Sequence, residues 1–199
     1  MQKLFQMEPY HCCNEYFEVH SKMMVTKEMK DTLMNLLIAE HSKSQMQAIV
    51  SFVGNSQARF DALVIIFLEN DRKLTQRASW PLSNCVEHHP GLVQKHLKQL
   101  LNKMNDPQQH PAVKRQVLRI FDMVEIPRSL HGQVMDVCIN TIASTTEAVA
   151  AQAFALGILQ KLTTIYPEIR HEVKTIIDSR MPYATAGFKS RAAKYLKAI

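Results

Sequence analysis

The apolar positions of this chain recur with helical spacing. Apolar side chains return every three or four residues over 93–104, 130–141 and 169–177, which is the pattern of amphipathic helices. The chain contains only five glycines among 199 residues. Because glycine is disfavoured in helix interiors, this composition supports the same conclusion. The pattern predicts an all-α protein.

A second pattern operates over a longer distance, because four segments resemble one another. Residues 72–82, 110–121, 146–157 and 185–196 align so that an apolar residue recurs 39, 36 and 39 positions apart. These residues are Leu74, Val113, Val149 and Phe188. Three positions later a long polar residue precedes a small apolar one, as Arg77-Ala78, Gln116-Val117, Gln152-Ala153 and Arg191-Ala192. We expect the small residue to let a neighbouring helix approach closely.

Each of the first three segments is followed by a proline and then by a second amphipathic stretch. The breaks are His89-Pro90, Ile126-Pro127 and Tyr166-Pro167. Proline is tolerated in the first turn of a helix and disfavoured inside it, so each break predicts the corner of a helical hairpin. A weaker copy precedes these, with its second helix over 56–70, and residues 26–39 predict a further helix. We therefore expect one repeat domain over 24–199 and an arm or cap over 1–23.

The hairpin unit resembles the HEAT and armadillo repeat families. The segment HPAVKRQVLRIF (110–121) is similar to the first-helix pattern of HEAT repeats, with Lys114 in the place of the usual arginine. In TEAVAAQAFALG (146–157) Ala150 replaces that basic residue. The resemblance covers residues 27–199 and implies a right-handed α-solenoid of helical hairpins. It predicts the fold and not the function, because this architecture hosts scaffolds, transport receptors, chaperone-like cofactors and a few enzymes.

Charge is distributed unevenly along the chain. Residues 1–69 contain 6 Lys and Arg against 8 Asp and Glu, whereas residues 70–199 contain 18 against 10. In solenoids of this kind the second helices are expected to line the concave face. The basic side chains of that face would be Lys95, Lys98, Arg128, His131, Arg170, His171 and Lys174.

This row of basic side chains permits three interpretations. The first is a solvated surface that provides solubility, the second is a groove for an acidic or extended protein partner, and the third is a site for nucleic acid. No aromatic side chains are interleaved for base stacking, which disfavours nucleic acid. The sequence therefore favours a protein-interaction scaffold over a nucleic-acid-binding protein.

An enzymatic alternative rests on the single tryptophan. HEAT-like DNA glycosylases that excise alkylated bases use tryptophan, aspartate and arginine in a concave groove. Here Trp80 lies in a first helix, and position 84 holds Asn84 where an aspartate would be needed, so the motif does not carry over. Beside it, Pro81 predicts a bend in the helix, or alternatively a functional pocket around Trp80.

Two groups of cysteine and histidine are candidate metal sites. Cys85, His88 and His89 lie on one helical turn, and a looser group spans 11–20. Zinc sites draw four ligands from two separated pairs, and neither group supplies them. We expect no metal, no other cofactor and no catalytic motif. Cys85 and Cys138, each among apolar residues, are predicted to be buried thiols.

The chain also gives an expectation about its compartment. Its longest apolar run, 62–68, is far shorter than the ~20 residues of a membrane span. The first residues do not have the layout of a secretory signal. These features predict a cytoplasmic protein. The sequence indicates nothing about the oligomeric state.

Overall fold

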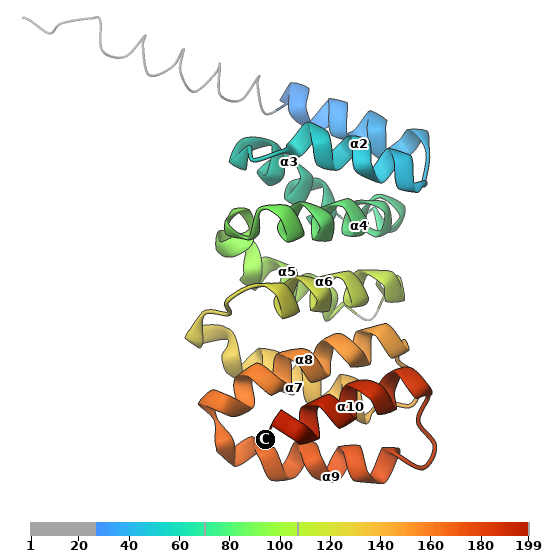
Figure 1. Ribbon diagram of the computed structural model, residues 1–199. Coiled ribbons are helices and arrows are strands. Elements are labelled where there is room, and N and C mark those ends of the chain that lie inside the picture. Colours follow the sequence, from blue (N-terminus) through green and yellow to red (C-terminus); the bar gives the residue numbers. More distant parts are fainter. Residues whose placement is uncertain (1–26, 70, 107, 199) are drawn as a thin grey trace, which may run out of the picture.

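The computed structural model describes residues 27–69, 71–106 and 108–198, and within them it contains helices and no strand. The arm or cap that we expected over 1–23 lies outside the described residues. The helices form a stack in which each layer follows the previous one along the sequence (Figure 1). The all-α class is thus confirmed, while the right-handed sense of the superhelix stays a prediction.

The helices fall into two rows, which are defined here by their members. The first row contains α2 (Lys43–Val53), α4 (Arg72–His88), α6 (Pro111–Met123), α8 (Val149–Ile165) and α10 (Ala186–Ala198). The second row contains the helix over 27–39, α3 (Gln57–Leu68), α5 (Leu97–Met104), α7 (His131–Ala143) and α9 (Arg170–Arg180). Short 3-10 turns, η1 (Pro90–His96), η2 (Arg128–Leu130) and η3 (Pro167–Ile169), lead into the last three.

The proline-based hairpin corners are present where the sequence places them. Pro90 and Pro167 begin η1 and η3, and Pro127 immediately precedes η2. Each proline therefore opens a second-row helix, where its missing N–H is not needed. In contrast, Pro81 lies inside α4, which continues through it to His88.

The repeated apolar positions build the core between the layers. Val113 and Phe188 are fully buried and Leu74 is nearly so, whereas Val149 is 37% exposed because it is the first residue of α8. The following small position is also inaccessible in Ala78 and Ala192. These side chains lie where one first-row helix packs on the next, which is the close approach that the pattern predicted.

The long polar residue of each repeat makes hydrogen bonds to other elements. Arg77 donates to carbonyl groups at the end of the helix over 27–39, and Gln152 donates to carbonyl groups in the turn before α8. The Gln116 amide oxygen accepts from Ser83 Oγ of α4 at 2.8 Å, and Arg191 donates to the Ala153 carbonyl of α8 at 3.2 Å. This position therefore ties layers or turns together.

Several cationic side chains form hydrogen bonds with the C-terminal ends of helices. Cations on later elements donate to carbonyls at the C-terminal ends of helices one repeat earlier: Arg77 at the helix over 27–39, Lys103 at α3 and Arg180 at α7. Arg77 Nη1, for example, lies 2.8 Å from the carbonyl oxygens of both Leu37 and Ile38. The last carbonyls of a helix lack intrahelical donors and carry partial negative charge, so cations stabilise them.

The two rows differ in how closely their members pack. Neighbouring helices of the first row contact one another extensively, from α4 through α6 and α8 to α10. Contacts between neighbours of the second row are slighter, as between α3 and α5. The first row therefore provides most of the packing between successive layers, and the concave position of the second helices stays a prediction.

Candidate functional site

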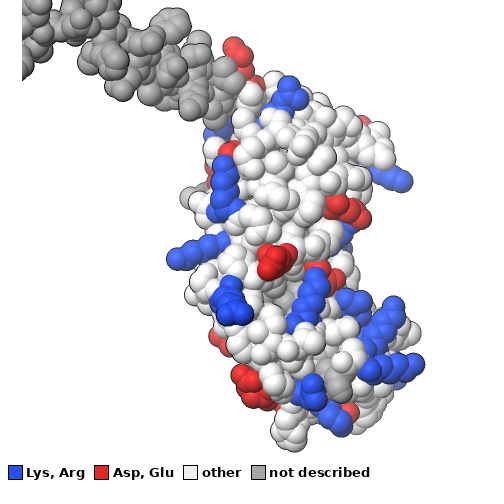
Figure 2. All heavy atoms as spheres, turned by 60° about the vertical axis from the view of Figure 1, so that its left-hand side comes forward, with Lys and Arg blue, Asp and Glu red and all other residues white. Residues whose placement is uncertain are grey.

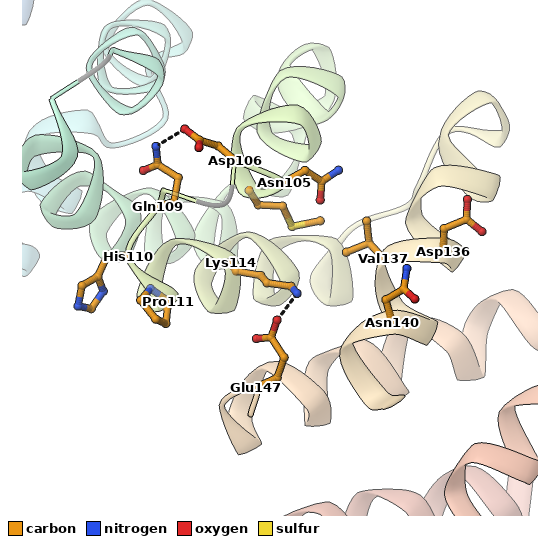
Figure 3. A pocket seen from close by; sticks show the side chains of 11 residues that line it. Asn105, Asp106, Gln109, His110, Pro111, Lys114, Asp136, Val137, Asn140 and Glu147 are labelled. Carbon is orange, nitrogen blue, oxygen red and sulfur yellow. Dashed lines mark hydrogen bonds and ion pairs between the residues drawn. The ribbon is translucent and has the colours of Figure 1, made fainter. Parts of the chain in front are cut away.

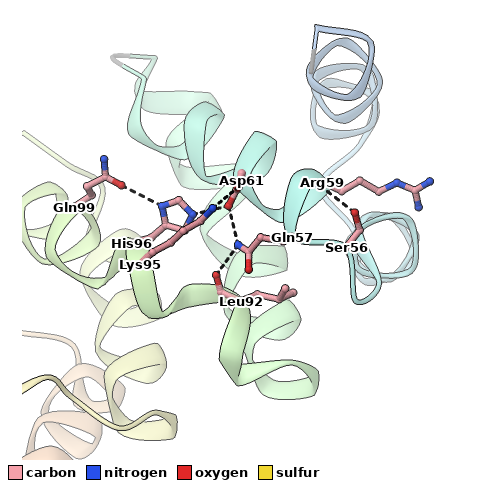
Figure 4. Close-up of polar contacts among 8 residues, drawn as sticks. All are labelled: Ser56, Gln57, Arg59, Asp61, Leu92, Lys95, His96 and Gln99. Atoms are coloured by element: carbon pink, nitrogen blue, oxygen red, sulfur yellow. Dashed lines mark hydrogen bonds and ion pairs between the residues drawn. The ribbon is translucent and has the colours of Figure 1, made fainter. Parts of the chain in front are cut away.

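The expected row of basic residues is partly neutralised. Lys95, in η1, forms an ion pair with Asp61 of α3, with 2.7 Å between Nζ and Oδ2 (Figure 4). His96 Nε2 lies 2.7 Å from the other carboxylate oxygen, and Gln57 Nε2 donates to the same group. Partial burial tends to raise the pKa of Asp61, but these hydrogen bonds outweigh it and lower the pKa below its ordinary value. Lys95 is thus engaged in joining two layers.

One residue of the expected row is not on the surface, so its assignment as an exposed basic group is wrong. His131 is 5% exposed at the start of α7. Its Nε2 lies 2.8 Å from the Ile126 carbonyl and its Nδ1 lies 3.1 Å from the Tyr166 hydroxyl. The carbonyl can only accept, so Nε2 donates and Nδ1 accepts from the tyrosine. The imidazole therefore holds the corner between two hairpins.

The remaining members of the row are exposed. Lys174 pairs with Asp178 one helical turn away, at 2.5 Å. Lys98, Arg128, Arg170 and His171 make no side-chain hydrogen bond or ion pair with the described residues. Figure 2 shows Lys and Arg interspersed with Asp and Glu over the described part of one face, with more positive residues toward the C-terminal end. A continuous cationic groove is not visible there.

A different surface contains several cavities of the described part of the molecule. It is the turn edge, where each second-row helix connects to the next first-row helix, and it comprises the described residues 40–42, 69, 71, 105–106, 108–110, 144–148 and 181–185. Three hollows open along it, and each is lined by residues from at least two layers. Each hollow is named here after one of its lining residues.

The Asp136 cavity, of about 490 Å³, lies between the α5–α6 turn and α7 (Figure 3). Asp106, Asp136 and Glu147 line it together with Lys114, which pairs with Glu147 of the next layer. Gln109 Nε2 donates to Asp106 at 2.8 Å, while the Gln109 amide oxygen is buried without a hydrogen-bond partner. Acidic and amide groups therefore dominate this hollow.

The Trp80 cavity, of about 440 Å³, lies between α4 and α6 near their N-terminal halves. Trp80 and Gln76 come from α4, Arg115 comes from α6, and His41 and His110 come from two turns of the turn edge. The His41 and Trp80 rings meet edge to face with 5.9 Å between their centroids. No Asp or Glu is among the described residues that line this cavity.

The Tyr183 cavity, of about 300 Å³, lies between the turns that precede α8 and α10. Tyr183 itself is 93% exposed, and Val149 adds a second exposed apolar side chain. The three cavities adjoin, because His110 lines both the Trp80 and Asp136 cavities and Glu147 lines both the Asp136 and Tyr183 cavities. They form one interrupted groove along the turn edge.

Comparison with known families accounts for this architecture. The model of a HEAT repeat domain matches residues 33–199, which is most of the chain. The chain belongs to the HEAT repeat domain family. Neither the curated proteins nor the solved structures include a match to it. HEAT repeat domains are typically non-enzymatic scaffolds that mediate protein interactions.

The remaining candidate features in the described part of this HEAT repeat domain are thiols, metal ligands and apolar helices. Cys85 and Cys138 are buried thiols, as predicted, and burial raises the pKa of Cys85 to about 12. A thiol of such high pKa is a poor nucleophile at neutral pH. The described residues contain no group of three or more His, Cys, Asp or Glu able to hold a metal, and the group over 11–20 lies outside them. None of the described helices is both long and apolar enough for a membrane span.

The groove of this HEAT repeat domain was largely missed by sequence reasoning. Its residues come from turns and from the N-terminal ends of first-row helices, which carry no periodic signal of their own. Only the pocket considered around Trp80 is present, and its position beside Pro81 was the one clue to it. The basic row drew attention to the second helices instead.

Proposed function

We propose that this chain is a protein-interaction scaffold that binds an extended segment of a partner protein along the turn edge. The adjacency of the Trp80, Asp136 and Tyr183 cavities carries the proposal, because hollows that share lining residues suit one ligand that extends over all of them. Ligands are generally received in concave sites that contain a few placed polar groups.

Exposed apolar side chains lie along the same edge. Ile38 is 56% exposed beside the first turn, Val149 begins α8 and Tyr183 lies in the last turn. Tyrosine contributes strongly to interfaces because it offers a large contact area at a small cost in side-chain entropy. Since the apolar positions are separated by polar hollows, an extended chain suits the groove better than an amphipathic helix, which needs a continuous apolar stripe.

The other functions considered receive less support. Nucleic acid would favour a concentrated positive surface, whereas Asp106, Asp136 and Glu147 line the middle of this groove. A DNA glycosylase would need an acidic group beside the tryptophan, and the described residues that line the Trp80 cavity include none. The basic row of the second helices stays an alternative surface for the protein partner, through Lys98, Arg128 and Arg170.

The experiment is an affinity capture from extract of the native organism, with the full chain as bait and quantitative mass spectrometry as the readout. Tyr183→Ala tests the groove. Ile165→Ala is its matched control, because Ile165 is also a large exposed side chain, 51% exposed, but ends α8 at the opposite edge. A triple variant, Lys98→Glu with Arg128→Glu and Arg170→Glu, tests the basic row.

The proposal predicts partners whose recovery falls about tenfold with Tyr183→Ala, the effect of removing an aromatic side chain that anchors the contact. Their recovery should be unchanged with Ile165→Ala and with the triple variant. Recovery that depends on the triple variant and not on Tyr183 would move the binding surface to the second row. Partners displaced by nuclease treatment would instead assign the protein to nucleic acid.

A further inference from the structure

One arginine in the Trp80 cavity differs from comparable cations of the chain. Arg115 is half-buried in α6, and it makes no hydrogen bond or ion pair within the described residues. Every other half-buried lysine or arginine of the described chain donates to a carbonyl or carboxylate. These are Lys30, Arg59, Arg77, Lys103, Lys114, Arg119, Arg180 and Arg191.

Arg115 lines the cavity with a positive charge that no carboxylate or carbonyl of the described residues neutralises. The neighbouring Lys114, in contrast, forms an ion pair with Glu147 of the next layer. Arg115 therefore retains the capacity to form a charge-assisted, bidentate interaction with an external carboxylate.

The other polar groups of the cavity can also donate hydrogen bonds. His110 Nδ1 accepts from the Ala112 backbone N–H at 3.1 Å, so the neutral ring carries its proton on Nε2, which is a donor. Trp80 offers an indole N–H and an apolar face, and Gln76 adds a side-chain amide. The described lining contains donors and no Asp or Glu, so the hollow is complementary to a small anionic group.

We propose that the Trp80 cavity binds an acidic side chain, aspartate or glutamate, of the partner segment, with its carboxylate on Arg115 and its stem against Trp80. This inference rests on the proposed function, since it names the chemistry of one position in that segment. A carboxylate on a side chain fits better than a nucleic acid, because the adjoining Asp136 cavity would repel a second phosphate.

Trp80 makes the proposal directly measurable, because it is the only tryptophan of the chain. Its indole N–H gives a single resonance in a proton–nitrogen correlation spectrum, so any ligand of the cavity is seen without assignment of other signals. The probes are a capped peptide of alternating glycine and glutamate, the same peptide with glutamine, inorganic phosphate, and a single-stranded oligothymidylate, each titrated into the full chain at low ionic strength.

The proposal predicts that the glutamate peptide shifts the indole resonance in a saturable manner and that the glutamine peptide does not. Arg115→Gln should lower the affinity for the glutamate peptide about tenfold or more, because a hydrogen bond to a charged group contributes at least that factor to affinity. Arg115→Lys should retain part of the affinity. Arg128→Gln, which changes an exposed arginine at the opposite edge, should have no effect.

Arg115→Gln should also leave the melting temperature unchanged, since the guanidinium makes no bond that folding would lose. A large fall in melting temperature would assign Arg115 a structural role and overturn the proposal. Equal responses to phosphate and to the glutamate peptide, a stronger response to oligothymidylate, or no response to any probe would overturn it as well. A glutamate-specific response together with partner capture that ignores Tyr183 would retain this site and refute the proposed groove.

Discussion

Asp122 of α6 and Arg191 of α10 meet across the helix that separates them, with 3.4 Å between Oδ2 and Nη2. They pass over Gly157 of α8, where a Cβ atom would lie 2.1 Å from Arg191 Nη2 and 2.4 Å from Asp122 Oδ1. Gly157 stands eight residues after Val149, at a repeat position where the other copies have Leu82, Phe121 and Leu196. Its missing side chain is what allows an ion pair to join three consecutive first-row helices.

Replacement of this glycine gives the first prediction. Gly157→Ala should destabilise the protein by about 1–3 kcal/mol, because the new methyl group displaces Arg191 and leaves the partly buried Asp122 without that partner. The sign of this stability change is informative, because helix propensity alone would give the opposite sign. Alanine is about 1 kcal/mol more favourable than glycine in a helix interior. Denaturant unfolding followed by circular dichroism measures the change.

The control for this prediction removes both obstructing side chains. In a background of Asp122→Ala with Arg191→Ala, Gly157→Ala should stabilise the protein by about 1 kcal/mol, because only the helix preference remains. An equal loss of stability in both backgrounds would show that the glycine is required for a different reason, and the bridging account would be wrong.

The cations at helix ends give the second prediction. Arg77→Met should cost about 1.5–3 kcal/mol, because it removes two hydrogen bonds from a charged donor to the Leu37 and Ile38 carbonyls while retaining the apolar stem. Lys73→Met, at an exposed position of the same helix α4, should change stability by less than about 0.5 kcal/mol. Similar losses for the two variants in thermal unfolding would contradict the assignment.

The cluster around Asp61 predicts a dependence on pH. Its pKa is lowered in the folded protein, so its contribution is present above the ordinary value of 3.8 and is lost as the pH falls through the folded pKa. Asp61→Asn should therefore lower stability by about 1 kcal/mol at neutral pH. The difference between wild type and variant should shrink below about pH 4 in denaturant titrations. A difference that stays constant with pH would exclude the carboxylate charge as its source.

The buried His131 gives the fourth prediction. Tyr166→Phe removes the hydroxyl that donates to His131 Nδ1 and should cost about 1 kcal/mol, while His131→Leu should cost about 2–3 kcal/mol because it also leaves the Ile126 carbonyl without its donor. Well below the melting temperature, partner capture should be unchanged in both. Loss of partner capture by a stably folded His131→Leu variant would indicate that His131 contacts the partner, and it would contradict its structural role.

The repeats could be predicted from the sequence because they depend on local spacing. The positions of Leu74, Val113 and Phe188 in the core follow from helical periodicity, and the prolines mark the corners by their missing N–H. The part played by the long polar residue was not predictable. Whether Arg77 or Arg191 faces solvent or a carbonyl depends on which helix end lies beside it, and this is a property of the stack.

The candidate site was less accessible to sequence reasoning for the same physical reason. Lys95 and His131 carry the same signal in the sequence as exposed cations, yet one pairs with Asp61 across layers and the other is buried at a corner. Conversely, His41 and Arg115 lie 74 positions apart and share a cavity only because the layers bring their turns and helices together. Charge along the chain therefore does not distinguish an exposed cation from one that is paired or buried within the stack.

The central claim is that a partner lies along the turn edge, and photo-crosslinking in the native cells tests it most directly. A photoreactive amino acid is placed singly at the exposed positions of His110, Ala148 and Tyr183 on the turn edge. For comparison it is placed at the exposed positions of Lys98, Arg128 and Arg170 on the other surface. The account predicts adducts with the same partner protein from all three turn-edge positions and none from the second set. Adducts from the second set alone would contradict it.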